Sequence, residues 1–202
     1  MRGARALSVA SVALALSGCA MQRVEVEPVA PRGAVVARPG RPGFVIAVSH
    51  ATADPQSRDV AAELARRTGF GLVIADGGRI YEQGVREAAQ GPLAFYAEIH
   101  GAPRSESASR IEIATVGGDA AHAGRLRTLF ELIRDAHLRG SPGAPRVDVL
   151  VAPADARDRL LLVPGRTIQV AVPRIARGEA REPYLTILAD FLAQAAALPV
   201  GR

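Results

Sequence analysis

Short apolar runs alternate with helix-forming segments along most of this chain, and this alternation limits the fold more than any other feature. Residues 44–49 are apolar almost throughout, as in a strand that is buried on both faces of a parallel sheet. Asp54 and Pro55 then begin a helix that should end before Gly69, and residues 71–75 read as the next strand. This strand-helix-strand order predicts an α/β sheet with right-handed crossovers.

The rest of the chain continues the pattern. Further strands are predicted at 93–99, 110–116, 147–151, 160–163 and 167–172, and helices at 81–89, 118–139 and 181–197. Residues 43–202 match the length of one domain, which is typically ~100–200 residues. We therefore predict a single α/β domain with a mostly parallel or mixed sheet and helices on both faces.

The N-terminus has the order of a secretory signal. Arg2 and Arg5 precede an apolar run over 6–16, which is shorter than the ~20 residues of a membrane span. Leu-Ser-Gly and then Cys19 follow, and this resembles the bacterial lipobox. The resemblance implies that residues 1–18 are a signal peptide and that Cys19 carries a lipid. The alternative is an ordinary secreted protein with Cys19 near its cleavage point.

Cysteine usage agrees with lipidation, because Cys19 is the only cysteine and no intramolecular disulfide can form. In bacterial lipoproteins a residue other than Asp after the lipidated cysteine usually permits sorting to the outer membrane. Ala20 therefore implies an anchor on the periplasmic face of that membrane. Residues 19–42 contain several Pro and Gly without a sustained period and read as a tether.

The basic net charge does not indicate a nucleic-acid partner. The chain has a net charge of +5, yet it contains no Lys, so every basic side chain is Arg and a GC-rich coding bias explains the excess. Aromatic residues make up only 4% of the chain, and no basic run is interleaved with them as a stacking surface requires. We predict contact with a membrane through the lipid and with a small acidic amide or an envelope polymer.

Two histidines stand at matching positions. His50 directly follows the strand at 44–49, and His100 follows the strand at 93–99. If these strands are parallel neighbours, both imidazoles lie at one edge of the sheet, where open α/β sheets bind ligands. Asp54 lies close enough in sequence to join them, and two His with one carboxylate form the three-ligand set of a catalytic zinc. The alternative for Asp54 is to cap the helix that Pro55 begins.

Two other carboxylates compete for a catalytic role. Glu98 lies two residues before His100 and hence on the same face of its strand, where it could orient the imidazole or act as a general base. Glu112, between two Ile residues, is the weaker candidate and could be a half-exposed strand residue. We predict Glu98 as the catalytic residue.

Two arginines are candidates for binding a substrate carboxylate. Arg104 lies in the loop after His100, and Arg174 lies just past the last strand, so each could make a bidentate contact. Surface positions are the alternative for both. His122 and His137, in or beside the helix at 118–139, have no acidic or cysteine partner at ligand spacing and are expected at the surface.

The two histidine segments, Val48-Ser-His50 and Glu98-Ile-His100-Gly101, together with the strand at 110–116, resemble the N-formylglutamate amidohydrolase family and the related poly-γ-glutamate hydrolases. The resemblance implies a phosphorylase/peptidorylase-like (carboxypeptidase-like) fold. It also implies Zn²⁺ as cofactor, held by His50, Asp54 and His100. It would cover most of residues 43–201.

The chain also departs from that family. The family has Pro-His-Ser-Gly or Pro-His-Gly-Gly at the first histidine, where this chain has Ser49, His50 and Ala51. A late strand in such enzymes supplies a catalytic Glu, but 167–172 offers only Gln169. Two functions therefore remain open: zinc-dependent hydrolysis of an amide bond at the cell envelope, and a non-catalytic binding or accessory lipoprotein that keeps the hydrolase fold.

Overall fold

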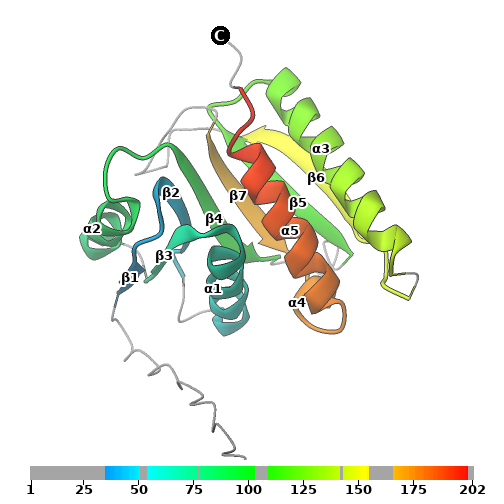
Figure 1. The fold of residues 1–202 in the computed structure, drawn as a ribbon, viewed down its shortest axis with the longest axis horizontal. Helices are drawn as coiled ribbons and strands as arrows, with labels where there is room; N and C mark the ends of the chain where they lie inside the picture. Colours follow the sequence, from blue (N-terminus) through cyan, green and yellow to red (C-terminus); the bar gives the residue numbers. More distant parts are fainter. Residues whose placement is uncertain are drawn as a thin grey trace, which may run out of the picture.

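The apolar runs of the sequence form the strands of one sheet in the computed structural model (Figure 1). The structure describes residues 35–50, 54–76, 78–102, 109–141, 143–154 and 166–199. Within these residues seven strands pair in the order β1-β3-β2-β4-β7-β5-β6. Their bounds are β1 Val36–Arg38, β2 Arg41–Val48, β3 Phe70–Ile74, β4 Phe95–Gly101, β5 Arg110–Val116, β6 Asp148–Ala154 and β7 Thr167–Val172.

The sheet is mixed. Strand β2 runs parallel to β3 on one side and to β4 on the other, and β4 is also parallel to β7. Strands β5 and β6 are parallel to each other but antiparallel to β7, and β1 is antiparallel to β3 at the edge. The parallel block β3-β2-β4-β7 therefore brings the carboxyl ends of β2 and β4 to one edge, as the sequence predicts.

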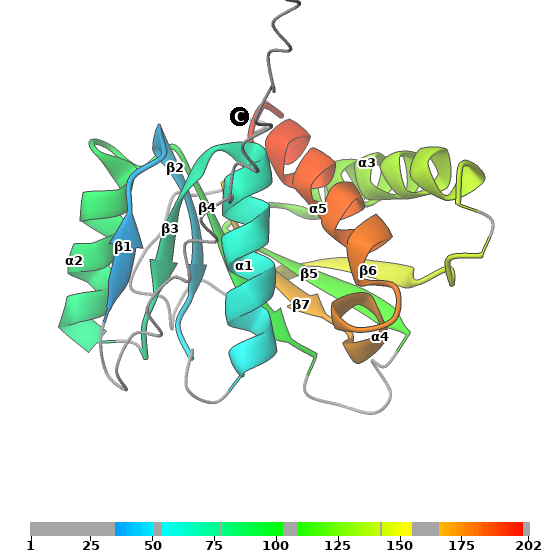
Figure 2. The same ribbon diagram turned by 60° about the horizontal axis from the view of Figure 1, so that its bottom comes forward.

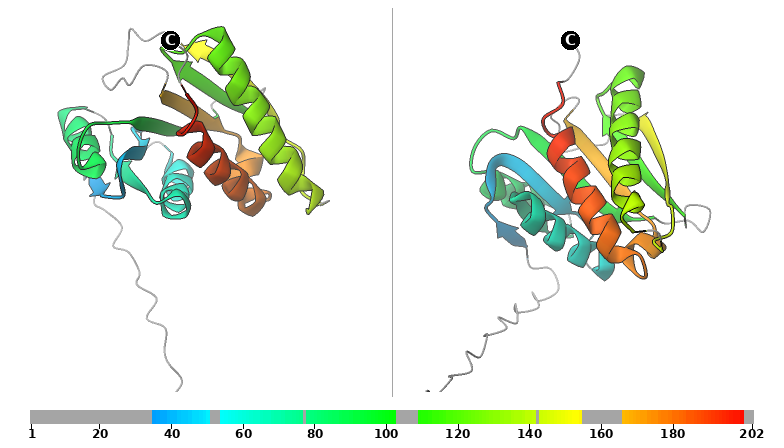
Figure 3. Two further views of the ribbon diagram at one scale, coloured as in Figure 1. Left: turned by 45° about the horizontal axis from the view of Figure 1, so that its top comes forward. Right: turned by 45° about the vertical axis from the view of Figure 1, so that its right-hand side comes forward.

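Helices cover both faces of the sheet, which confirms the predicted α/β class. Their bounds are α1 Pro55–Thr68, α2 Gly78–Ala89, α3 Ala120–Arg139, α4 Arg174–Arg177 and α5 Arg181–Ala195. Helices α1, α3 and α5 lie over one face, and Figure 2 shows β1 and β3 between α1 and α2. Figure 3 shows the sheet and its helices in two further views. None of the helices that the structure describes is both long and apolar enough to cross a bilayer.

The core has two parts because the strand side chains alternate between the faces. In β2, Ile46 and Val48 pack in the larger cluster with α1, α3 and α5, whereas Val45 and Ala47 pack in the smaller cluster with α2. The two clusters explain why 44–48 is apolar at every position: both faces of this strand are covered.

One part of the sheet is left open on the side of α2. Helix α2 packs over β1, β3 and β2, and the described residues place no helix over the same face of β7, β5 and β6. Leu150 of β6 points to that face and is 43% exposed, while its neighbour Val149 is buried on the other face. This uncovered face begins beside β4, which carries His100 and Glu98.

Helix α1 begins and ends at the predicted residues. The Asp54 side chain accepts a hydrogen bond from the Ser57 N–H, Pro55 is the first helical residue, and Gly69 ends the helix in the left-handed conformation at φ 70°. A residue with a Cβ is disfavoured at that φ, so the sequence marks this end of the helix directly.

Several boundaries differ from the prediction. Residues 36–38 and 41–42, expected in the tether, belong to β1 and β2, because three residues are too few to show a strand period. The predicted strand at 160–163 lies outside the described residues. Strand β4 begins two residues later than predicted and continues through Gly101, because its last residues pair with β7.

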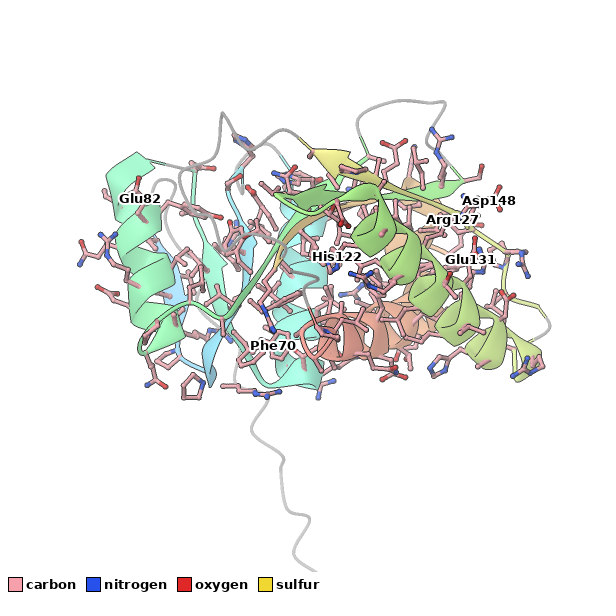
Figure 4. The ribbon with its side chains drawn as sticks, turned by 90° about the horizontal axis from the view of Figure 1, so that it is seen from above. Phe70, Glu82, His122, Arg127, Glu131 and Asp148 are labelled. Atoms are coloured by element: carbon pink, nitrogen blue, oxygen red, sulfur yellow. The ribbon has the colours of Figure 1, made fainter. Side chains whose placement is uncertain are left out.

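The sequence suggests a surface position for His122, but this prediction is wrong. His122 is 3% exposed in the first turn of α3, where its backbone N–H donates to the Asp119 carboxylate at 2.6 Å. His137 is half-buried and bonds Asp190 at 2.7 Å. Figure 4 labels His122 on α3 together with Arg127 and Glu131, which form an ion pair at 3.0 Å. Neither His122 nor His137 belongs to the edge of the sheet that holds His50 and His100.

Candidate functional site at the carboxyl edge of the sheet

The two histidines meet at one edge, as the sequence predicts. Strands β2 and β4 are parallel neighbours, with Ala47 opposite Glu98. His50 lies two residues beyond the end of β2, and His100 is the sixth residue of β4. Their ring centroids are 6.3 Å apart with the planes inclined by 38°. The His50 side chain is exposed and that of His100 is 27% exposed, so both can be reached by a ligand.

Glu98 is buried directly beneath this pair. It shares the face of β4 with His100, and its Oε1 lies 3.6 Å from His100 Nε2. The Ser49 hydroxyl donates to the same oxygen, and Gln169 Nε2 donates to Oε2 at 3.1 Å. Its side chain is 12% exposed. We call Ser49, Glu98, His100 and Gln169 the Glu98 cluster.

The surroundings of Glu98 keep it charged. Burial raises the pKa of its carboxyl group, but the hydrogen bond and charge of His100 and the hydrogen bonds from Ser49 and Gln169 together lower that pKa below its ordinary value. A carboxylate in this state can accept a proton or attract a positively charged or hydrogen-bond-donating group. It is not a carboxylic acid that donates a proton at neutral pH.

Two buried tyrosines lie on the same face of the sheet as Glu98. Tyr96 lies two residues before Glu98 on β4 and its hydroxyl is hydrogen-bonded to that of Tyr81 in α2. Burial, and then the negative charge of Glu98, raise the pKa of Tyr81. Tyr81 therefore stays protonated and adds no charge near the Glu98 cluster.

Asp54 has different partners from those predicted for a metal ligand. It caps α1 by accepting from the Ser57 N–H at 3.2 Å and from the Ser57 hydroxyl at 2.6 Å. Nη1 of Arg177, the last residue of α4, donates to both carboxylate oxygens at 2.9 and 3.2 Å. We call Asp54, Ser57 and Arg177 the Asp54 cluster. The helix-cap alternative for Asp54 is the one that the structure confirms.

The Asp54 carboxylate is stabilised in its charged form. Burial raises its pKa, but the Ser57 hydroxyl, the Arg177 charge, and the backbone N–H groups of Ser57 and Gly101 together lower it below the ordinary value. All of these donors belong to the protein itself. Both carboxylate oxygens of Asp54, which would have to bind a metal, already accept hydrogen bonds from them.

Gly101 connects the two clusters. A Cβ at this position would lie 2.1 Å from Asp54 Oδ2 and 2.9 Å from the two terminal nitrogens of Arg177. Only glycine lets the Asp54–Arg177 pair pack against the residue that follows His100. The His100-Gly101 sequence thus supplies one residue to each cluster.

The predicted zinc ligands do not form a metal site as they stand. Among the residues that the structure describes, no three His, Cys, Asp or Glu side chains are arranged to hold a metal ion. His50 and His100 approach each other, but the third predicted ligand, Asp54, is bound by Ser57 and Arg177. The two imidazoles therefore lie close together, but the Asp54 carboxylate that would complete the ligand set already has other partners.

A cavity of about 500 Å³ opens beside the Glu98 cluster on the uncovered face of the sheet. His100, Gly101 and Gln169 line the end near the cluster, and small or apolar residues line the rest: Ile113, Ala114, Leu150, Ala152 and Ala171. Glu112 also lines it, although its carboxylate bonds Arg110 at 2.9 Å. The cavity offers a polar end and an apolar floor to a small ligand.

The structure describes one of the two predicted arginines. Arg174, the first residue of α4, is exposed, and Arg104 lies outside the described residues, as does Cys19. The sequence alone does not indicate Arg177, Ser49 as a donor, or the direct contact of Gln169 with Glu98. Arg177 lies one helical turn after Arg174, so a helix that begins at Arg174, directly after Pro173, would have indicated it.

The fold and the residues at the carboxyl edge of its parallel strands define the class of this chain. It is an α/β domain with a mixed sheet that presents two histidines and two carboxylates at that edge. No protein-family model and no curated protein matches the chain.

Solved structures with a similar arrangement include hydrolases. A bacteriophage poly-γ-glutamate hydrolase aligns with 85% of this chain and 91% of its own, at 12% identity and a TM-score of 0.44. An N-acetylmuramoyl-L-alanine amidase from Nostoc punctiforme aligns with 78% and 97%, at 16% and 0.39. A proposed carboxypeptidase A from Shewanella denitrificans aligns with 81% and 60%, at 8% and 0.46. With TM-scores below 0.5, these likenesses carry no conclusion about the activity of this chain.

Proposed function

We propose that this chain is a lipid-anchored protein of the bacterial cell envelope whose domain binds a small acidic amide, or the end of an envelope polymer, without hydrolysing it. The ligand contacts His50 and His100 and extends into the cavity on the uncovered face of the sheet. The imidazoles and the Gln169 amide can hydrogen-bond carbonyl and carboxylate oxygens, and the apolar floor accepts the carbon chain between them.

One observation carries the choice of binding over hydrolysis. The Asp54 carboxylate is bound to Arg177 and Ser57, and within the described residues it does not form a three-ligand group with the two histidines. The loss of the late-strand Glu points the same way, since Gln169 cannot accept a proton as a carboxylate does. The edge retains groups that recognise a ligand, but its predicted metal ligand has another role.

The second candidate is zinc-dependent hydrolysis of an amide bond, which the family resemblance implies. The close approach of His50 and His100 favours it, and so does Glu98. The register pairs Glu98 with Gln169, so a charged carboxylate lies one strand away from the position where the family has its catalytic Glu. Glu98 could serve there as a general base. This candidate requires Asp54 to leave Arg177.

Binding and hydrolysis are separated by one assay of the full chain. We would measure binding of N-acetylglutamate and of a γ-glutamyl peptide by calorimetry, and product formation with and without added zinc. The proposal predicts saturable binding that His100→Ala abolishes, with no product. Zinc-dependent product that Glu98→Gln abolishes would establish the second candidate instead, and absence of binding in every condition would overturn the proposed ligand class.

The anchor is tested separately. Cys19→Ser should abolish fatty-acyl labelling and leave the precursor uncleaved by the lipoprotein peptidase, because the thiol is the site of lipid attachment. Ala20→Asp should keep the label but move the protein away from the outer membrane. Normal labelling of Cys19→Ser would remove the lipoprotein proposal.

A further inference from the structure

The uncovered face of the sheet presents its side chains in rows that cross the strands. His100 of β4 pairs with Ala171 of β7, and Ala171 pairs in turn with Glu112 of β5. The row ends at Leu150 of β6, which pairs with Glu112. All four residues line the cavity beside the Glu98 cluster. Because paired residues of neighbouring strands project to the same face, only the methyl group of Ala171 stands between the His100 imidazole and the Glu112 carboxylate.

This row sets a spacing for a ligand. Neighbouring strands lie roughly 4.8 Å apart, so the backbones of His100 and Glu112, two strands apart, are separated by roughly 10 Å. A small ligand that crosses Ala171 can therefore contact both side chains. The next row carries polar groups only on β4 and β7; its members are Glu98, Gln169, Ala114 and Ala152. The cavity thus has an imidazole and an amide at one end and a carboxylate at the other.

Glu112 is the more accessible of the two carboxylates on this face. Its side chain is 34% exposed, against 12% for Glu98, whose oxygens already accept from Ser49 and Gln169. Arg110 donates to Oε1 of Glu112 with two nitrogens, at 2.9 and 3.3 Å. A carboxylate has about four acceptor positions, so Glu112 can accept from a ligand while it keeps Arg110.

We propose that Glu112 is a specificity-determining residue that selects a ligand with an ammonium group. The ammonium group lies against the Glu112 carboxylate, the carbon chain crosses Ala171, and the amide carbonyl contacts His100 and Gln169. A carboxylate attracts a cation and repels a ligand end that carries only negative charge, so a ligand whose amine is blocked binds more weakly. This deepens the proposed function, on which it rests for the binding of an amide in this cavity.

The test compares γ-glutamylalanine, which has a free ammonium group, with N-acetyl-γ-glutamylalanine, in which that group is blocked. Binding of each peptide to the full chain is measured by calorimetry. The parent chain should bind the free amine about 10-fold more tightly, which is the low end for a hydrogen bond between charged groups because Glu112 is partly exposed. Glu112→Gln should remove this preference by weakening the binding of the free amine alone. Since the acetyl group is the same in both chains, this result separates charge from ligand size.

Glu131→Gln is the matched control. Glu131 forms an ion pair with Arg127 at 3.0 Å on α3, which covers the opposite face of the sheet (Figure 4). Its side chain is 38% exposed, close to the value for Glu112, and the substitution changes the net charge by the same amount. The preference of the parent chain for the free amine should persist in this variant.

A second variant tests the path of the ligand. Ala171→Leu fills the space between His100 and Glu112 and should weaken the binding of both peptides. If circular dichroism shows that this variant does not fold, Ala171→Val takes its place with the same expected result. The inference is overturned if Glu112→Gln keeps the preference of the parent chain, or if the folded Ala171 variant binds both peptides as the parent does. In either case, binding that His100→Ala abolishes would leave the proposed function standing. Absence of binding of both peptides to the parent chain would instead overturn the proposed function, and this inference with it.

Discussion

The Asp54 and Glu98 clusters lie at the same edge of the sheet, and in both a partly buried carboxylate is held in its charged form by different means. Asp54 is bound by a permanent cation and a helix N-terminus. Glu98 is bound by a hydroxyl and an amide, with an imidazole 3.6 Å away. The pKa of each carboxyl group lies below its ordinary value, although burial alone would raise it.

We expect this difference to separate a structural role for Asp54 from a ligand-binding role for Glu98. The partners of Asp54 connect α1 to α4, so its oxygens maintain the fold. The partners of Glu98 are neutral or titratable groups beside a cavity, so they can exchange hydrogen bonds with a ligand. Removing Asp54 should therefore cost mainly stability, and removing Glu98 mainly binding.

The largest effect is expected from Gly101→Val, which removes the space that the Asp54–Arg177 pair occupies. The new side chain would displace the ends of the Asp54 and Arg177 side chains, and loss of the α1 cap together with the Asp54–Arg177 hydrogen bonds should lower the free energy of unfolding by about 3 kcal/mol. Urea denaturation measures this change. A loss below about 0.5 kcal/mol would mean that the pair does not pack against Gly101.

Gly124→Ala is the control for that experiment. Gly124 lies within α3, and a Cβ there meets no atom within 4 Å. Alanine favours a helix over glycine by about 1 kcal/mol, so this variant should be slightly stabilised. Opposite signs at the two glycines would show that contact at Gly101, and not the loss of glycine itself, causes the effect.

A smaller loss is expected from Asp54→Ala. This change removes the cap of α1 and leaves Arg177 without its partner, which should cost about 2 kcal/mol. Glu98→Gln should cost under about 1 kcal/mol at pH 7, because the hydroxyl and amide around it can form hydrogen bonds to an amide side chain. Equal losses in the two variants, measured by urea denaturation, would remove the distinction between the clusters.

The smallest effect concerns pH. Because the pKa of Glu98 is lower in the folded chain than in the unfolded chain, its charge stabilises the fold at pH values above the ordinary glutamate pKa of 4.5. This contribution is lost as the pH falls through the lowered pKa. The parent chain should thus lose more stability than Glu98→Gln between pH 5 and strongly acidic conditions, as measured by urea denaturation across that range. Parallel pH profiles would contradict the lowered pKa.

Local patterns were enough to predict much of the fold. The mostly apolar run at 44–49 indicates a strand covered on both faces, and Asp54, Pro55 and Gly69 mark the ends of α1. The matching positions of His50 and His100 predicted that two parallel strands would bring them to one edge. Each of these inferences uses residues close together in sequence.

What was missed depends on contacts between distant segments. The hydrogen bond from Gln169 to Glu98 follows from the register of β4 against β7, which no local pattern fixes. Asp54 had two plausible roles for the same oxygens, and the decision depends on Arg177, 123 positions away. The sequence indicates Arg174 because it lies just past the last strand, whereas the single turn of α4 places Arg177 at the edge.

A double-mutant cycle of Asp54→Asn and Arg177→Met tests most directly whether these two residues hold each other at the edge. Both substitutions keep the side-chain size close to the original, and the free energies of unfolding of the four chains are measured in urea without metal. The account predicts a favourable coupling of about 1–2 kcal/mol between the two residues, within the usual range for contacting polar groups. Additive losses, with a coupling near zero, would contradict the assignment of Arg177 as the partner of Asp54.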